Sequence, residues 1–213
     1  MAAAFRIFDL DGTISDPAVG IGRSINYALE YFGYPPIPDR EVSRLIGPPL
    51  DQTFQSIVGS ASPEHIAQLV AKYRERYAEV GYSENVIYPG IPEALLRLSA
   101  ADIPMGVCTS KRADFAERIL KLFGIREHFD FISGGDIGVR KVDQLAYLLG
   151  NRTIGKASIM IGDRAVDILA AKANGLRSVA VLWGHGSVEE LQSVVPDALL
   201  KAPEELVSIA AER

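Results

Sequence analysis

Residues 5–16 read FRIFDLDGTISD, an apolar run that is followed at once by two aspartates, Asp9 and Asp11. The apolar run is typical of a buried strand, and Asp, Gly and Thr are common where a strand passes into a turn. Two carboxylates this close repel each other, and removing them from water is costly unless they gain partners or a bound cation. The stretch therefore predicts either an ordinary strand-to-turn boundary or an acidic site at the end of a strand.

The bulk composition is that of a globular protein with its own core. The chain has 213 residues, of which 48% are hydrophobic and 23% charged, close to the averages for soluble domains. A chain of this length buries enough surface to fold without disulfides or a structural metal. Its single cysteine, Cys108, excludes an internal disulfide framework and is typical of a reducing compartment.

Charge and hydropathy restrict the expected partners. The formal net charge is −5 and the sequence has no long basic run, which argues against nucleic acid and against an anionic membrane surface. No uninterrupted apolar run is long enough to cross a bilayer, and Arg6, Asp9 and Asp11 interrupt the place where a signal peptide would be apolar. We expect a cytoplasmic protein, a monomer or homodimer, that acts on a small molecule.

Residues 23–81 carry helical signals and no convincing strand. The clearest helix begins at Ser62 and Pro63, an N-cap serine followed by a proline in the first turn. One face of that helix is apolar and consists of Ile66, Leu69, Val70, Tyr73 and Tyr77. We therefore predict a helical cap domain that comprises residues 15–86.

From Val86 onward, short apolar strands alternate with helices. The expected strands are MGVCTS (105–110), FDFISGG (129–135), ASIMIGD (157–163) and SVAVLWG (178–184), and a final helix is expected after Pro203. Such alternation predicts a parallel sheet with helices on both faces. The predicted fold class is α/β: a Rossmann-like core formed by residues 1–14 and 87–213, with the helical cap inserted after the first strand.

Polar side chains follow three of these strands at the point where each ends. Asp9 to Thr13 follow the first strand, and Thr109, Ser110 and Lys111 follow the strand that contains Cys108. Asp163 follows a third strand, with Asp167 four residues later. Because ligands bind beyond the carboxyl ends of parallel strands, this coincidence favours an acidic site over a plain turn boundary.

The chemistry open to these side chains is limited. Asp9, Asp11, Asp163 and Asp167 form an oxygen-rich set without a cysteine or histidine cluster, which favours Mg²⁺ over zinc. A carboxylate can attack phosphorus and form an aspartyl-phosphate, and a second carboxylate two residues away can transfer the protons.

The remaining polar residues would bind and neutralise a phosphoryl group. Thr109, Ser110 and backbone N–H groups can hold phosphoryl oxygens, while Lys141, at the start of a predicted helix, offsets negative charge. Metal, lysine and phosphate together would make the aspartate pair tolerable.

At this point the sequence resembles the haloacid dehalogenase superfamily of phosphotransferases. DLDGT (9–13), VCTS (107–110), Lys141 and IGDRAVD (161–167) are similar to its four motifs and stand in the same order. The resemblance covers essentially the whole chain.

The resemblance implies a role for each motif. Asp9 would be the nucleophile and Asp11 the general acid and base. Asp9, the backbone carbonyl of Asp11, and Asp163 would bind Mg²⁺, with Asp167 steadying the site. Lys141 would be the third-motif lysine, although relatives often have proline after it and this chain has Val142, so that Arg140 is an alternative.

Five further residues are candidates for binding phosphate or the rest of the substrate. Gly12 and Thr13 belong to the first motif. Arg44 precedes the break at Gly47-Pro48-Pro49 and suits a substrate carboxylate or second phosphate, although a surface ion pair is equally compatible with its position. Trp183 and His185 follow a strand, and the sequence leaves open whether they contact the substrate.

The inserted helices, with LIGPPLDQTF (45–54) and VLWGHGSVEEL (181–191), resemble the phosphoglycolate phosphatase-like branch. The implied activity is Mg²⁺-dependent hydrolysis of a small phosphate monoester, with 2-phosphoglycolate the best single substrate. A phosphatase for nucleotides, sugar phosphates or pyrophosphate, or a phosphomutase, remains open. A receiver-like or phosphate-binding protein without turnover is disfavoured by the helical insert and by Asp11.

Overall fold

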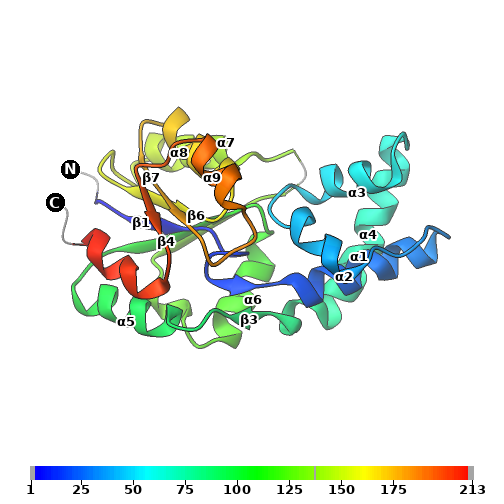
Figure 1. Cartoon of the computed structure of the whole chain (residues 1–213), viewed down its shortest axis with the longest axis horizontal. Helices are drawn as coiled ribbons and strands as arrows, with labels where there is room; N and C mark the ends of the chain where they lie inside the picture. Colours follow the sequence, from blue (N-terminus) through cyan, green and yellow to red (C-terminus); the bar gives the residue numbers. More distant parts are fainter. Residues whose placement is uncertain (1–2, 137, 211–213) are drawn as a thin grey trace.

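The computed structural model describes residues 3–136 and 138–210. Its centre is a sheet of parallel strands (Figure 1). The sheet has six strands, in the order β5-β4-β1-β6-β7-β8. The strands are β1 (Arg6–Phe8), β4 (Met105–Thr109), β5 (Phe131–Gly134), β6 (Ile159–Gly162), β7 (Arg177–Val181) and β8 (Ala198–Leu200). This arrangement confirms the predicted α/β class with a parallel sheet.

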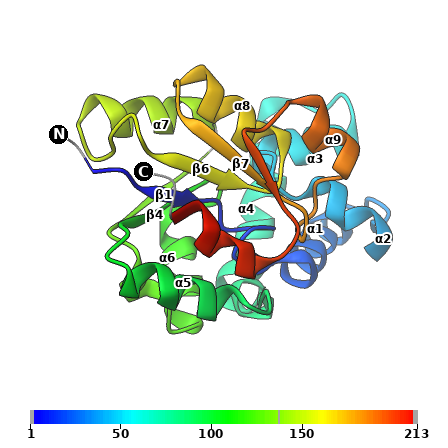
Figure 2. The ribbon, with the colours of Figure 1, turned by 60° about the vertical axis from the view of Figure 1, so that its left-hand side comes forward.

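Helices cover both faces of the sheet (Figure 2). One face packs against α5 (Ile91–Ala100), α6 (Ala113–Leu122) and η4 (Pro203–Ala210), and the other against α7 (Lys141–Gly150) and α8 (Ala165–Ala173), with α9 (Val188–Ser193) beside α8. Strand β1 shows why two faces exist: successive side chains of a strand point to opposite sides. Ile7 joins the cluster that contains Leu145, whereas Phe8 joins the cluster that contains Leu95.

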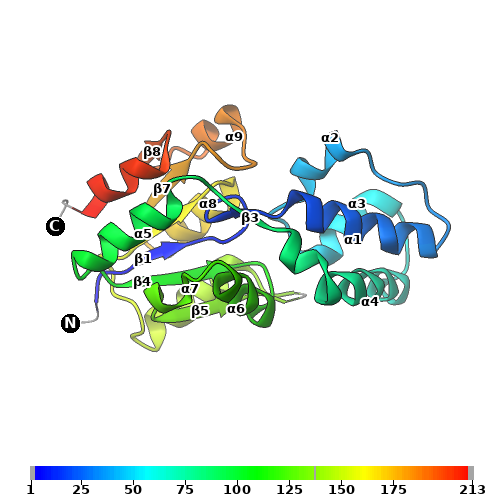
Figure 3. The same cartoon turned by 90° about the horizontal axis from the view of Figure 1, so that it is seen from below.

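The position of β1 determines where the functional residues meet. Arg6 pairs with Met105 of β4 on one side and with Ile159 of β6 on the other. The three strands that precede the polar segments of the sequence are therefore direct neighbours. Their carboxyl ends lie at the same edge of the sheet, on the side that faces the inserted helices (Figure 3).

The insert is a group of helices between two short strands, β2 (Ser15–Asp16) and β3 (Val86–Ile87). Its elements are α1 (Ala18–Tyr31), α2 (Asp39–Val42), η1 (Ser43–Leu45), α3 (Leu50–Val58), α4 (Pro63–Glu79) and η2 (Gly81–Glu84). Residues 17–85, all within the described part of the chain, contain no strand, as the sequence predicted. The insert buries an apolar cluster that includes Ile25, Leu29, Phe54 and Leu69 and is joined by Phe115 of α6.

Strands β2 and β3 pair with each other in antiparallel register, Ser15 with Ile87 and Asp16 with Val86. This small ribbon is where the chain leaves the core and returns to it. It supports our proposal that a cap of residues 15–86 and a core of residues 1–14 and 87–213 are separate units.

Local signals explain several boundaries. The Ser62 hydroxyl accepts a hydrogen bond from the backbone N–H of His65 at 3.2 Å, which caps α4 as predicted. Gly124 adopts a positive φ of 67° just after the end of α6, the usual glycine stop. The described residues contain no helix with the length and hydropathy that a bilayer crossing requires.

Two features near the end of the chain differ from the sequence prediction. Strand β8 was not predicted, because it has three residues and pairs only with β7 at the edge of the sheet, and an alternation so short gives no signal. The predicted helix after Pro203 is a 3₁₀ helix.

We predict unequal costs for two adjacent leucines of α5. Leu95 is fully buried, whereas Leu96 is 61% exposed. Leu95→Ala should lower the free energy of unfolding by about 2–5 kcal/mol, because it leaves a cavity in the core, and Leu96→Ala should change it by less than about 0.5 kcal/mol. Urea unfolding followed by circular dichroism measures both, and equal costs would contradict the packing described here.

Candidate active site

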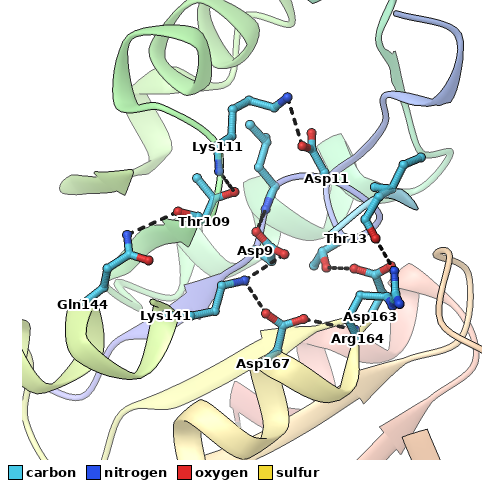
Figure 4. A network of polar contacts seen from close by, with 12 residues as sticks. Asp9, Asp11, Thr13, Thr109, Lys111, Lys141, Gln144, Asp163, Arg164 and Asp167 are labelled. Atoms are coloured by element: carbon cyan, nitrogen blue, oxygen red, sulfur yellow. Dashed lines mark hydrogen bonds and ion pairs between the residues drawn. The ribbon is translucent and has the colours of Figure 1, made fainter. Parts of the chain in front are cut away.

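Three buried carboxylates lie together at the carboxyl edge of the sheet. Asp9 follows β1, Asp163 follows β6, and Asp167 lies in the first turn of α8 (Figure 4). One oxygen of each lies within 4.8 Å of the others. Oxygen ligands from a few carboxylates are what Mg²⁺ takes in proteins, and the set fits that ion.

Lys141, the first residue of α7, provides a buried positive charge beside this cluster. Its Nζ lies 2.9 Å from Oδ2 of Asp9 and also contacts Oδ1 of Asp167. Burial by itself lowers the pKa of the Lys141 ammonium, but the charges of Asp167 and Asp9 outweigh burial and raise that pKa. Arg140 is instead largely exposed and paired with Asp143, so the structure brings Lys141 to Asp9.

The charges of this cluster are not balanced by Lys141, which contacts two of its three carboxylates. Burial, with the repulsion of Asp167 and then Asp9, raises the pKa of Asp163 to about 8. Asp163 accepts hydrogen bonds from the Thr13 hydroxyl at 3.1 Å and from the backbone N–H of His185 at 2.8 Å. Charged carboxylates so deeply buried need compensation, and a divalent cation would supply it.

Two glycines make room for the carboxylates. Gly12 has a φ of +82°, and a Cβ on it would lie 2.1 Å from Oδ2 of Asp163. A Cβ on Gly162 would lie 2.2 Å from Cγ of Asp167. The Asp-Gly and Gly-Asp pairs in the sequence are thus a steric requirement of the cluster.

Asp11 lies close to these carboxylates but faces another way. Its side chain points toward Lys111, whose Nζ is 2.9 Å from Oδ2 (Figure 4). Burial raises the pKa of the Asp11 carboxyl above its ordinary value. The charge of Lys111 opposes this rise, and the charge of Asp9 adds to it. A carboxyl group held in this state is suited to donating a proton.

A cavity of about 90 Å³ lies between the sheet edge and the inserted helices. The residues that line it include Asp9, Asp11, Thr109 and Ser110 from the core and Tyr73 and Tyr77 from α4. The backbone of Thr109 is fixed by Gln144, whose Nε2 donates to the Thr109 carbonyl at 3.2 Å. The structure therefore brings Asp9, Asp11, Thr109 and Ser110 to one cavity.

Three residues predicted to bind substrate lie elsewhere. Gly12 and Thr13 lie behind the cavity, where the Thr13 hydroxyl donates to Asp163 and its carbonyl accepts from the Trp183 indole at 2.9 Å. The Arg44 side chain is 70% exposed and pairs with Glu41. Arg44 is not among the residues that line the cavity, and the surface ion pair is the alternative that the structure shows.

The loop after β7 contacts both the carboxylate cluster and the insert. His185 donates its backbone N–H to Asp163, and its Nδ1 lies 2.9 Å from the hydroxyl of Ser43 in η1. Burial lowers the pKa of the His185 ring. Neither Trp183 nor His185 is among the residues that line the cavity, and their contacts are with Thr13 and Asp163 respectively.

Several cavity residues are not among the candidates that the sequence motifs predict. Lys111, Arg74 and Arg112 bring positive charge to the cavity, and Tyr73 and Tyr77 bring aromatic rings. The position of Lys111, directly after Thr109 and Ser110 at a strand end, was an available signal. The tyrosines gave none, because their spacing on α4 is that of ordinary core residues.

The family comparison agrees with this geometry. A family model described as haloacid dehalogenase-like hydrolase matches residues 6–181. The chain belongs to the haloacid dehalogenase-like hydrolase family. The predicted superfamily is thereby confirmed.

Three similar proteins are named for different activities. The tyrosine-protein kinase PtkA of Mycobacterium tuberculosis is 37% identical over 86% of this chain, and the chain spans only 63% of its length. A 5'-nucleotidase of Pseudomonas aeruginosa is 38% identical over 89% of this chain and 87% of its own. A phosphoglycolate phosphatase of Yersinia pseudotuberculosis is 34% identical, and the match covers 91% of this chain and 87% of the relative.

The fold is also that of a solved structure. A predicted phosphatase of Clostridium acetobutylicum superposes with a TM-score of 0.92 at 31% identity, and each chain is covered completely. Helical insert and parallel sheet thus occur together in another protein of this size.

We predict that alanine is tolerated less well at Gly12 than at Gly33. Both glycines have positive φ, but a Cβ on Gly33 meets no atom within 4 Å. Gly33→Ala should cost about 1–2 kcal/mol through backbone strain alone, and Gly12→Ala should cost a further 1–3 kcal/mol or so because Asp163 must move. Urea unfolding of both variants measures the difference, and an equal cost would show that the overlap with Asp163 is relieved without strain.

Proposed function

We propose that the protein is a Mg²⁺-dependent phosphatase that hydrolyses a small phosphate monoester, with 2-phosphoglycolate the best single substrate. The observation that carries the proposal is the setting of Asp9. Its carboxylate lines the cavity, Lys141 holds one of its oxygens, and Asp163 and Asp167 lie beside it. Membership of the hydrolase family supports the same reaction class.

Asp9 is the proposed nucleophile because it is held in place while still open to the cavity. The backbone N–H of Leu10 donates to Oδ1 at 2.7 Å, and Lys141 lies 2.9 Å from Oδ2. These contacts fix the carboxylate for attack on phosphorus, which forms an aspartyl-phosphate as the ester oxygen leaves.

Asp9, Asp163 and the backbone carbonyl of Asp11 would hold Mg²⁺, with Asp167 steadying the site. The ion would offset the charge of the carboxylates and of the substrate phosphate. Lys141 adds a fixed positive charge to the same region.

Asp11 is the proposed general acid and base, in keeping with its raised pKa and its place on the cavity wall. It gives its proton to the leaving oxygen in the first step. In the second step it takes a proton from the water that attacks the aspartyl-phosphate, which releases inorganic phosphate and restores Asp9. Thr109 and Ser110 are the proposed partners of the phosphoryl oxygens.

The size and charge of the cavity support a small anionic substrate. A volume of about 90 Å³ is well below the roughly 300–1,000 Å³ of pockets that enclose drug-sized ligands. Arg74 and Arg112 also line the cavity and carry positive charge. The similarity to the Yersinia phosphoglycolate phosphatase points to the same substrate.

A nucleotide is the second candidate substrate. The 5'-nucleotidase of Pseudomonas aeruginosa is as similar to this chain as the other relatives, and Tyr73, Tyr77 and Phe115 offer aromatic surface at the cavity. A base could stack on these rings only if the inserted helices moved outward. The similarity to PtkA makes transfer from ATP to tyrosine a further outcome to test.

We predict metal-dependent release of inorganic phosphate from 2-phosphoglycolate. The panel for this measurement also contains 5'-mononucleotides, sugar phosphates and pyrophosphate, each with Mg²⁺ and with excess EDTA. Release should be fastest from 2-phosphoglycolate and should stop with EDTA. Preference for a mononucleotide would replace the proposed substrate. Release from none of them, with phosphotyrosine formed from ATP, would replace the proposed reaction.

We predict that Asp9→Asn lowers turnover by about 10³-fold or more, because an amide is a far weaker nucleophile than a carboxylate. The matched control is Asp130→Asn, a change at an exposed aspartate just before β5, which should leave turnover unchanged. Circular dichroism establishes that both variants fold. Normal turnover in folded Asp9→Asn protein would refute the assigned nucleophile.

A further inference from the structure

A continuous chain of polar contacts joins Asp11 to the base of the inserted helices. Lys111 Nζ lies 2.9 Å from Asp11 Oδ2 and donates to the Tyr77 hydroxyl at 2.7 Å. The amide of Asn85 donates to that hydroxyl at 3.4 Å, and its oxygen accepts from the Ser15 hydroxyl at 3.0 Å. Asn85 and Ser15 belong to the two segments that connect insert and core.

We propose that Lys111 and Tyr77 form a cap-dependent clamp that positions Asp11 for proton transfer. Lys111 is a positioning residue in this proposal, and Tyr77 is the contact through which the cap acts on it. The inference rests on the proposed phosphatase function, since it concerns the residue that would protonate the leaving oxygen.

Tyr77 is held in a fixed position by its neighbours. Its ring is 1% exposed, stacks on Tyr73 with centroids 5.3 Å apart, and meets the edge of Phe115 at 5.1 Å. Lys111 Nζ also lies 4.5 Å from the centre of the Tyr77 ring, where a cation is attracted to the aromatic face. A side chain held on so many sides defines one place for the Lys111 ammonium.

The two residues of the clamp belong to different units of the protein. Lys111 follows β4 of the core, whereas Tyr77 lies in α4 of the cap. Movement of the cap away from the core would separate Tyr77 from Lys111, since no covalent connection nearby holds them together. Lys111 would then be free to turn, and Asp11 would lose the charged partner that orients it.

Asp11 is also connected through its backbone to the β2–β3 ribbon. Asp11 forms a bridge with Ser15, and Gly12 donates its backbone N–H to the Ser15 carbonyl at 2.8 Å. Ser15 in turn pairs with Ile87 in the β2–β3 ribbon. The backbone and the side chain of Asp11 thus both depend on elements that a cap movement would displace.

Loss of the clamp should slow the cleavage of some substrates and not of others. A leaving alkoxide needs the proton of Asp11, whereas a leaving acetate is stable without one. If Lys111 positions Asp11, then loss of the clamp should slow the cleavage of an alkyl phosphate and spare the cleavage of an acyl phosphate. A residue that simply binds the substrate phosphate would affect both.

The experiment compares ethyl phosphate with acetyl phosphate, which are similar in size and lack a carboxylate. The quantity measured is kcat/KM, which reports the steps up to departure of the leaving group. We expect Lys111→Met to lower kcat/KM for ethyl phosphate by about 10²-fold, the lower end of the range for general acid catalysis, and to lower that for acetyl phosphate by less than 3-fold or so.

Further variants separate the clamp from other roles. Tyr77→Phe keeps the ring and removes the hydroxyl, and should show the same selectivity with a smaller loss. Lys111→Arg should restore part of the activity toward ethyl phosphate. The control is Lys121→Met in α6, where the lysine is 65% exposed and pairs with Glu117, and both substrates should be unaffected.

Other results of this experiment would contradict the proposed clamp. Equal losses with both substrates in Lys111→Met protein would make Lys111 a substrate-binding residue and overturn the clamp. Unchanged kcat/KM with both would overturn it as well. Wild-type protein that releases no phosphate from either test substrate, nor from 2-phosphoglycolate, mononucleotides, sugar phosphates or pyrophosphate, would instead overturn the proposed phosphatase function, and the clamp with it.

Discussion

Three buried carboxylates around one lysine ammonium are the constraint on which this structure depends. Asp9, Asp163 and Asp167 are each at most 3% exposed, and burying such charges is unfavourable unless they are paired. Lys141 meets part of that requirement through Asp9 and Asp167. The strands and helices that carry these residues are therefore held together at the carboxyl edge of the sheet by these polar contacts. The contacts act in addition to the packing of the apolar faces.

Much of the core and its acidic residues could be predicted from the sequence, because the signals are local. An apolar run that ends in Asp9, and another that ends in Asp163, identify strands and the edge where they finish. The order of strands in a parallel sheet then places these residues side by side. The choice of Lys141 over Arg140 needed the structure, since it depends on which side chain of two neighbours faces inward from the start of α7.

The contribution of the cap could not be predicted in the same way. Arg44 was a reasonable candidate from its type and its loop, but its side chain lies outward beside Glu41. Tyr77 has the spacing of a core residue and is one, yet its hydroxyl also reaches Lys111 of the core. Contacts of this kind depend on how two units pack together, and neither hydropathy nor spacing along one segment carries that information.

The central position of β1 has a consequence for how the protein is made. β1 pairs with Met105 on one side and Ile159 on the other, so it lacks its second neighbour until Ile159 has left the ribosome. The packed helices α1 and α4, by contrast, are complete once Glu79 has emerged. Since contacts between distant segments form late and local ones early, the newly synthesised chain is expected to carry a folded cap on a core that is still open.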